Sequence, residues 1–229
     1  MGAVVELVSA DGTRVPAYVA TPTGAVRGAV VVLQEIFGVN SHIRSVADGY
    51  AQAGYLAVAP STFHRAEQGV ELGYAEDDMK RGFGLKMAVE ALPSPGAMAD
   101  IQAAVAYAGQ RAGGKVGVVG YCWGGLLTWR AACGLEGVSA AVPYYGGGMT
   151  TEAEAARQPK CPVMAHFGEA DHWIPLDTVH AFAAAQPGVQ VHVYAANHGF
   201  NCDQRGAYNA AAANLARDRT LAFFAEHLG

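Results

Sequence analysis

The chain has 229 residues, of which 52% are hydrophobic and 15% charged, and its formal net charge is −5. This composition is typical of a folded globular protein and excludes a disordered chain. No run of Lys or Arg offsets the acidic balance, so we expect neither a nucleic-acid partner nor binding to an anionic membrane surface. The longest apolar runs have the length of a strand, which is too short to cross a bilayer.

The N-terminal residues lack the basic start and the long apolar stretch of a signal peptide, so we expect a cytoplasmic protein. The four cysteines form no CxxC pair; they are Cys122, Cys133, Cys161 and Cys202. Their irregular spacing in a cytoplasmic chain argues against disulfides and against structural zinc. We expect buried small side chains with at most one reactive thiol, and neither a metal nor an organic cofactor.

Strand-like and helix-like patterns alternate along the chain. Residues 4–22 alternate apolar and polar side chains around Asp11-Gly12, which predicts a hairpin. Apolar runs predict buried strands at 29–34, 55–60, 115–121, 138–145, 161–168 and 189–195. Helical patterns are expected at 41–53, 96–112, 123–133, 176–185 and 207–227. This order predicts an α/β fold with a mainly parallel sheet and helices on both faces. No linker or repeat divides the sequence, so residues 1–229 are expected to form one domain.

The segment 61–84 differs from its surroundings because it is polar and mixed in charge. In an open α/β fold, ligands bind beyond the carboxyl ends of the strands, and this segment is one candidate to cover that edge. The alternative is an excursion into solvent. The sequence leaves both open.

A nucleophile motif follows the strand at 115–121. The residues Gly120-Tyr121-Cys122-Trp123-Gly124 match the pattern G-x-S-x-G with cysteine in place of serine. A sharp turn from strand to helix holds the central residue in a strained conformation, and glycines on either side avoid collisions. The first amides of the helix favour a thiolate and an oxyanion. The alternative is a buried cysteine in a tight turn.

Two later strands supply partners for this thiol in the chain order of an α/β-hydrolase, which is nucleophile, acid, histidine. Asp171 follows the strand at 161–168, and His198 follows the strand at 189–195. Glu169 is a second candidate for the acid, and Asp171 is also a candidate helix cap. The other histidines are expected to be structural (His172), in the core or on the sheet face (His166 and His192), or at the surface (His42, His64, His180 and His227).

Four motifs together resemble the dienelactone hydrolase (carboxymethylenebutenolidase) family over nearly the whole chain. They are Gln34-Glu35-Ile36-Phe37-Gly38, the Cys122 motif, Asp171-His172 and Asn197-His198-Gly199-Phe200. The resemblance implies an α/β-hydrolase fold with about eight strands. It also implies hydrolysis of 4-carboxymethylenebut-2-en-4-olide to maleylacetate, in the degradation of chlorinated aromatics, through a thioester on Cys122.

The resemblance further implies roles for individual residues. Glu35 would restrain the resting thiol and accept its proton when substrate binds, and the amides of Ile36 and Trp123 would hold the oxyanion. A glutamate that follows a buried strand needs an ionic partner, for which an arginine is the natural candidate.

The substrate-binding residues depart from the family pattern. Cys202 stands where the family would place one of two arginines that clamp the substrate carboxylate. Arg205 and Arg81 are therefore the candidate carboxylate ligands, and Phe37 is a third candidate substrate contact. Because a bidentate arginine strongly affects substrate choice, this departure bears on the substrate and leaves the chemistry in place.

The expected partner is a small, anionic lactone or ester, and the chain is expected to be a monomer. A general carboxylesterase or thioesterase on the same scaffold is the first alternative function. A non-catalytic ligand-binding or redox-sensing protein is the second.

Overall fold

Eight strands form a single sheet in the computed structural model, which describes residues 2–229. The strands are β1 (Ala3–Val8), β2 (Arg14–Ala20), β3 (Ala29–Leu33), β4 (Leu56–Pro60), β5 (Val116–Tyr121), β6 (Val138–Tyr144), β7 (Met164–Gly168) and β8 (Gln190–Tyr194). Their order is β1-β2-β4-β3-β5-β6-β7-β8. The hairpin β1–β2 is antiparallel to its neighbour β4, and the strands from β4 to β8 run parallel. The expectation of a mainly parallel sheet is confirmed.

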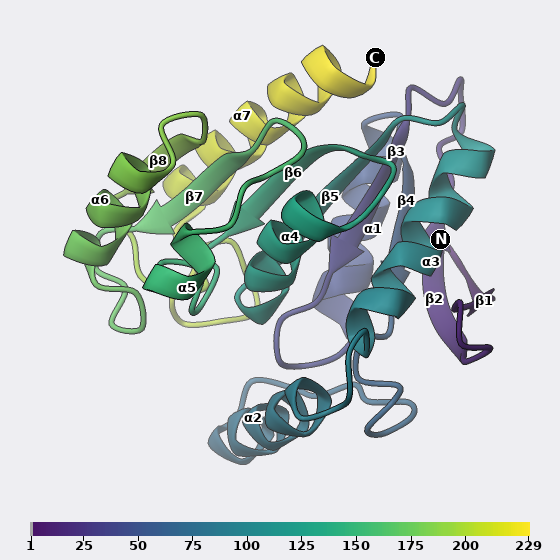
Figure 1. Cartoon of the computed structure of the whole chain (residues 1–229), viewed down its shortest axis with the longest axis horizontal. Helices are drawn as coiled ribbons and strands as arrows, with labels where there is room; N and C mark the ends of the chain where they lie inside the picture. The colour runs from purple at the N-terminus through teal and green to yellow at the C-terminus, as the bar shows by residue number, and fades with distance from the viewer. Residues whose placement is uncertain (1) are drawn as a thin grey trace.

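Helices cover both faces of this sheet. The helices of residues 2–229 are α1 (Ser41–Gln52), α2 (Glu76–Glu90), α3 (Ala97–Arg111), α4 (Trp123–Gly134), α5 (Glu152–Ala155), α6 (Leu176–Ala185) and α7 (Ala210–Leu228). Figure 1 shows α3 and α4 in front of the sheet and α1 behind it. The rings of Tyr50 in α1 and Phe224 in α7 meet at 6.0 Å, so α7 shares the rear face with α1.

Burial of the strands follows their position in the sheet. Every residue of β3, β4, β5 and β7 is buried, as expected of parallel strands covered on both faces. The strand β8 is half exposed along most of its length because it lies at the edge of the sheet. The uniform apolar pattern of its sequence therefore overstated its burial. Among the described residues, no helix combines the length and apolar character needed to cross a bilayer.

The structure contains a helix, α2, that the sequence patterns did not predict. It begins inside the polar segment 61–84 and carries three acidic residues in its first turn, which favour a helix start. Figure 1 places α2 at the bottom of the view, apart from the layers that cover the sheet. Residues of α2 line a cavity together with Ile36, which follows β3, and Cys122, which follows β5. The segment thus covers the carboxyl ends of the strands, the first of the two alternatives left open.

Candidate active site

A cavity of about 270 Å³ opens at the carboxyl ends of the parallel strands. Its apolar walls come from Ile36, Phe37, Met79, Phe83, Trp123 and Trp173, and its polar groups from Lys86, Cys122, His198 and Arg205. Open α/β sheets bind ligands at this edge, and a mostly apolar cavity with a few convergent polar groups is the usual form of a small-molecule site.

Cys122 occupies a strained turn between β5 and α4. Its backbone has φ 56° and ψ −118°, in the region that residues other than glycine rarely adopt. A Cβ atom on Gly120 would lie 2.1 Å from the carbonyl oxygen of Gly124, and one on Gly124 would lie 2.4 Å from that of Gln34. The two glycines therefore permit the turn that presents the thiol to the cavity.

Asp171 and His198 meet beside this thiol. The Nδ1 atom of His198 lies 2.7 Å from Oδ2 of Asp171, and both side chains are buried. The other carboxylate oxygen of Asp171 accepts hydrogen bonds from the amides of Trp173 at 2.8 Å and Ile174 at 3.2 Å. These bonds fix the carboxylate. Asp171 therefore orders the loop after β7 through one oxygen and orients the imidazole of His198 through the other. Glu169 is exposed, and no hydrogen bond or ion pair joins its side chain to His198 among the described residues, so Asp171 is the acid that meets this histidine.

The surroundings of His198 favour its protonated form. Burial alone lowers the pKa of the imidazole, but negative charge on Cys122 and hydrogen bonds to Asp171 and Cys122 outweigh burial. Together they raise the pKa of His198 to about 10. An imidazolium beside a thiol stabilises the thiolate, so the arrangement can supply a nucleophile and the acid that accompanies it.

Backbone groups near Cys122 can bind an oxyanion. Trp123 is the first residue of α4, where helix amides have no partner within the helix. Ile36 follows β3 and lies on the wall of the same cavity. The structure thus brings both expected oxyanion residues to Cys122.

Glu35 and Arg205 form a buried ion pair at the cavity wall. The Nη1 atom of Arg205 lies 3.2 Å from Oε1 of Glu35, whose side chain is 1% exposed. The guanidinium also lies over the ring of Phe37, 5.6 Å from its centre, and over that of Tyr74 at 5.9 Å. Arg205 is therefore the arginine partner that a buried glutamate requires, and it reaches the cavity although it stands three residues beyond Cys202.

Arg81 does not line the cavity, so the expectation that it contacts the substrate was wrong. It lies on the exposed side of α2 and pairs with Glu67. The cavity side of α2 carries Met79, Phe83 and Lys86, which recur at helical spacing, and Arg81 falls outside that phase. Lys86 is the cation that α2 brings to the cavity, and its ammonium lies 2.7 Å from Glu90.

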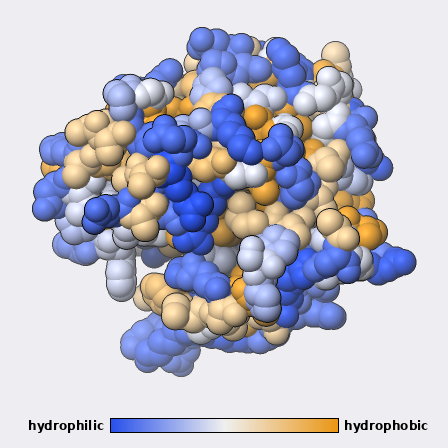
Figure 2. Space-filling view, viewed as in Figure 1, coloured by the Kyte–Doolittle hydropathy of each residue, from blue (hydrophilic) through white to orange (hydrophobic). Residues whose placement is uncertain are grey.

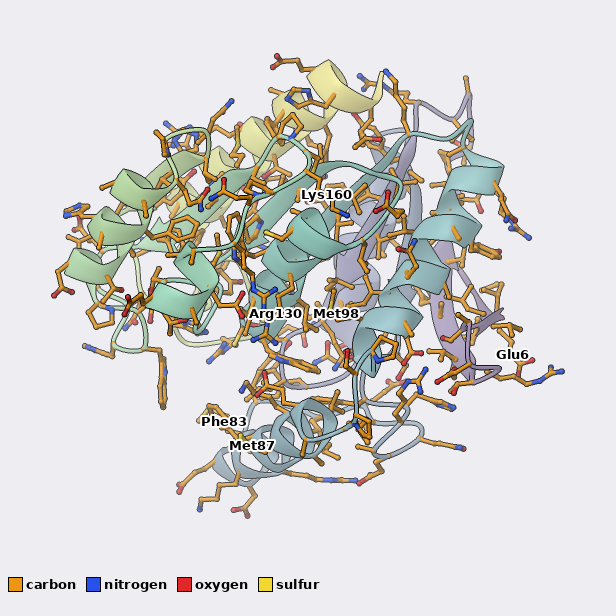
Figure 3. All side chains as sticks on the ribbon, viewed as in Figure 1. Glu6, Phe83, Met87, Met98, Arg130 and Lys160 are labelled. Carbon is orange, nitrogen blue, oxygen red and sulfur yellow. The ribbon has the colours of Figure 1, made fainter. Side chains whose placement is uncertain are left out.

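Aromatic side chains form a rim at the mouth of the cavity. The rings of Phe83 and Trp173 lie 5.8 Å apart, and Trp173 is 67% exposed. Figure 3 shows Phe83 and Met87 together on α2, and Figure 2 shows hydrophobic residues along this helix with hydrophilic ones below them. Large exposed apolar side chains beside a cavity are typical of a site that binds apolar parts of a ligand.

Two histidines outside the catalytic motifs can be compared with their expected locations in the fold. His166 is buried and bonds to Tyr194 and Thr220, which confirms a core role. His42 was expected at the surface, and this was wrong: it is 3% exposed, with Nδ1 3.2 Å from Asp203. Nothing local in the sequence signals this burial, because the contact joins residues 161 positions apart.

Known proteins of similar sequence and fold indicate the family of this chain. Residues 15–228 match the model of the "Dienelactone hydrolase family". A carboxymethylenebutenolidase of Pseudomonas putida is 35% identical over 96% of this chain and 95% of its own length. A Klebsiella pneumoniae structure, described as a candidate dienelactone hydrolase, is 31% identical, with a TM-score of 0.83 over 99% of this chain and 98% of its own. A Pyrococcus furiosus esterase shares the fold, with 15% identity and a TM-score of 0.71 over 100% of this chain and 94% of its own. The chain therefore belongs to the dienelactone hydrolase family of ester and lactone hydrolases.

Proposed function

We propose that this hydrolase opens an enol-lactone that carries a carboxylate, such as 4-carboxymethylenebut-2-en-4-olide, which yields maleylacetate in the degradation of aromatic compounds. The observation that carries the proposal is that Cys122, His198 and Arg205 all line one cavity. Such a substrate requires a nucleophile with a base beside it and a cation for its carboxylate. The name of the Pseudomonas putida relative, carboxymethylenebutenolidase, supports the same substrate class.

In the first step the Cys122 thiolate, whose proton is held by His198, attacks the carbonyl carbon of the lactone. The amides of Trp123 and Ile36 hold the oxyanion that develops. The bond between the carbonyl carbon and the ring oxygen then breaks, and the acyl group remains on Cys122 as a thioester. The leaving group is an enolate with delocalised charge, and it takes the proton from His198.

In the second step His198 is neutral and accepts a proton from water, while Asp171 holds the imidazole in the required orientation. The resulting hydroxide attacks the thioester carbon. Cys122 leaves as the thiolate beside a protonated His198, so the pair returns to its starting state. The carboxylic acid formed on the product releases its proton to solvent.

Glu35 acts in this scheme through Arg205. In the family-based expectation Glu35 accepts the thiol proton, but here Oε1 of Glu35 is engaged by Arg205, while Cys122 and His198 line the same cavity. We therefore assign the thiol proton to His198. Glu35 keeps the guanidinium in place until the substrate carboxylate replaces it, which avoids an unpaired buried charge in the free enzyme.

A second candidate function is a general carboxylesterase, and the exposed aromatic rim favours it. Phe83 and Trp173 can bind apolar acyl or alcohol groups without any carboxylate. The two candidates share the same thiol chemistry and differ in their dependence on Arg205.

The test is hydrolysis of cis-dienelactone, trans-dienelactone and p-nitrophenyl acetate by the wild type and by Cys122→Ala. Loss of lactone hydrolysis in the variant supports the nucleophile and the substrate class together. Turnover of the simple ester alone by the wild type moves the protein to the carboxylesterase alternative. Lactone hydrolysis unchanged in Cys122→Ala contradicts the proposed nucleophile. Cys133→Ala is the matched control, because this half-buried cysteine lies outside the cavity.

The proposed enzyme suits a reducing compartment. All four cysteines are free, as expected for a cytoplasmic location, which we also propose. Its action as a monomer remains a prediction, and sedimentation of the purified chain tests it.

A further inference from the structure

A second group of metal-ligating side chains lies behind the cavity wall. It comprises Glu35 after β3, His42 in α1 and Cys202 in the loop before α7, and one donor atom of each lies within 4.8 Å of the other two. Among residues 2–229, no other three His, Cys, Asp or Glu side chains have this spacing. The group joins three distant segments of the chain.

Two donor atoms in this group are buried and lack a hydrogen-bond partner. They are Oε2 of Glu35 and Nε2 of His42, on side chains of residues that are 1% and 3% exposed. Buried polar atoms are nearly always paired, because each one left alone costs free energy. The Nδ1 atom of His42 already faces Asp203, which leaves Nε2 as the ring atom that can bind a metal.

Two of the three side chains also have an outer partner. Asp203 engages His42 at 3.2 Å, and Arg205 engages the other oxygen of Glu35 at 3.2 Å. Such outer contacts orient the ligands in metal sites.

The charges around the group favour a divalent cation. Glu35, Asp203 and a Cys202 thiolate carry three negative charges, and the guanidinium of Arg205, which pairs with Glu35, neutralises one of them. A cysteine binds a metal as the thiolate, so a cation that binds Cys202 must release the thiol proton to solvent.

We propose that Glu35, His42 and Cys202 bind a borderline divalent cation of the Zn²⁺ type. One oxygen, one nitrogen and one sulfur ligand match the donors that Zn²⁺ prefers, at about 2.0–2.3 Å from the metal, with water as a fourth ligand. On binding, the S–H bond of Cys202 breaks, its proton leaves to solvent and a sulfur–metal bond forms.

A surface cavity of about 390 Å³ reaches one of the three ligands, His42. Its other polar lining residues include Asp48, Asp203 and Arg217. Asp203 is 63% exposed, so a hydrated cation can meet a carboxylate before it reaches the buried ligands.

Occupancy of this site affects hydrolysis, a consequence that rests on the proposed function. A cation that takes Oε2 of Glu35 weakens the hold of this carboxylate on Arg205 and places positive charge beside the guanidinium. Zn²⁺ at this site therefore changes the binding of the lactone carboxylate from behind the cavity wall, without contact with the lactone.

The binding test uses Cys122→Ser, because Cys122 and His198 could themselves bind a soft metal and Cys122→Ser removes that thiolate. Titration with Co²⁺ reports a cysteine ligand through sulfur-to-cobalt charge-transfer absorption, and competition with Zn²⁺ gives the Zn²⁺ affinity. Neither readout depends on hydrolysis, so failure of this proposal and failure of the proposed function are distinguishable.

We expect charge-transfer absorption in Cys122→Ser, its loss on adding Cys202→Ser, and a fall in Zn²⁺ affinity of at least about 100-fold. Cys202→Ser is nearly isosteric, and circular dichroism checks that it folds. Asp203→Asn should weaken binding by about tenfold, as an outer partner does. Absorption that survives Cys202→Ser, or that vanishes in the control Cys133→Ser instead, overturns the proposal. Absence of any absorption in the Cys122→Ser parent also overturns it.

Discussion

The molecule contains two groups that each combine a cysteine, a histidine and carboxylates, and they differ in access and in charge. Cys122, His198 and Asp171 lie at a cavity, with the thiol on a strained turn. Cys202, His42 and Glu35 lie behind its wall, with the thiol wholly buried. In the first group the pKa of His198 is raised to about 10, whereas in the second burial raises the pKa of the thiol to about 11.

The difference shows that residue types alone do not define a nucleophile. Cys122 gains its role from the turn that exposes it and from an imidazolium beside it. Cys202 lies among carboxylates and a phenol, an environment that keeps the thiol protonated until a cation replaces the proton. The same side chains thus suit catalysis at one place and cation binding at the other.

The largest difference in kcat/KM is expected between the variants in which Cys122 or Cys202 is replaced by alanine. Cys122→Ala should lower kcat/KM by about 10⁴-fold, because it removes the nucleophile. Cys202→Ala should lower it by less than about tenfold, since this thiol does not reach the cavity. Steady-state hydrolysis of the lactone measures both, after circular dichroism has checked the fold. Equal losses in the two variants would remove the distinction between the groups.

The two aspartates make the next comparison. Asp171→Asn should reduce kcat/KM by about 10³-fold, because an amide no longer fixes the tautomer and stabilises the charge of His198. Asp203→Asn keeps the shape of the second group and should change kcat/KM by less than about threefold. The same lactone assay applies. A larger loss in Asp203→Asn than in Asp171→Asn would mean that the proposed orienting residue is misassigned.

A smaller effect is expected for substrate choice. Arg205→Gln should lower kcat/KM for the dienelactones about 100-fold more than for p-nitrophenyl acetate, because only the lactones carry a carboxylate. Arg81→Gln is the matched control and should leave the ratio unchanged, since Arg81 lies on the exposed side of α2.

Arg205→Gln leaves Glu35 buried without its partner and can destabilise the fold. The double variant with Glu35→Gln removes this unpaired charge, and thermal unfolding measures the rescue. If the folded double variant keeps its preference for the charged lactones, Arg205 does not select the substrate.

The sequence predicted the catalytic group better than the one behind it, and the reason is physical. Strands β3 and β5 read as uninterrupted apolar runs, and the glycines around Cys122 report a local constraint on the turn. Asp171 and His198 follow strands in a fixed order, so topology alone brings them together. The predicted residues are those whose position depends on a nearby strand end.

The remaining features depend on contacts between distant residues. His42 and Cys202 meet through the folding of α1 against the loop before α7, which no local pattern encodes. The helix α2 is missed because it has charged residues around its surface and two glycines, so no apolar stripe marks it. Without knowledge of the helix, the sequence does not show which side chains of this segment face the cavity. It therefore does not reveal that Lys86, and not Arg81, lines the cavity.

The last prediction concerns the charge of His198 itself. Because Cys122 contributes to raising its pKa to about 10, Cys122→Ala should lower that pKa by more than about one unit, as burial then acts with less opposition. Titration by NMR of the imidazole nitrogens measures this in both proteins. The folded value lies above the unfolded value of 6.5, so protonation of His198 stabilises the wild type fully below pH 6.5. This contribution fades as the pH rises towards 10, and unfolding by urea over that range should show a shallower loss for Cys122→Ala. An unchanged pKa in the variant would mean that Asp171 alone sets the charge of His198, and that the thiol and the imidazole are not coupled in the resting enzyme.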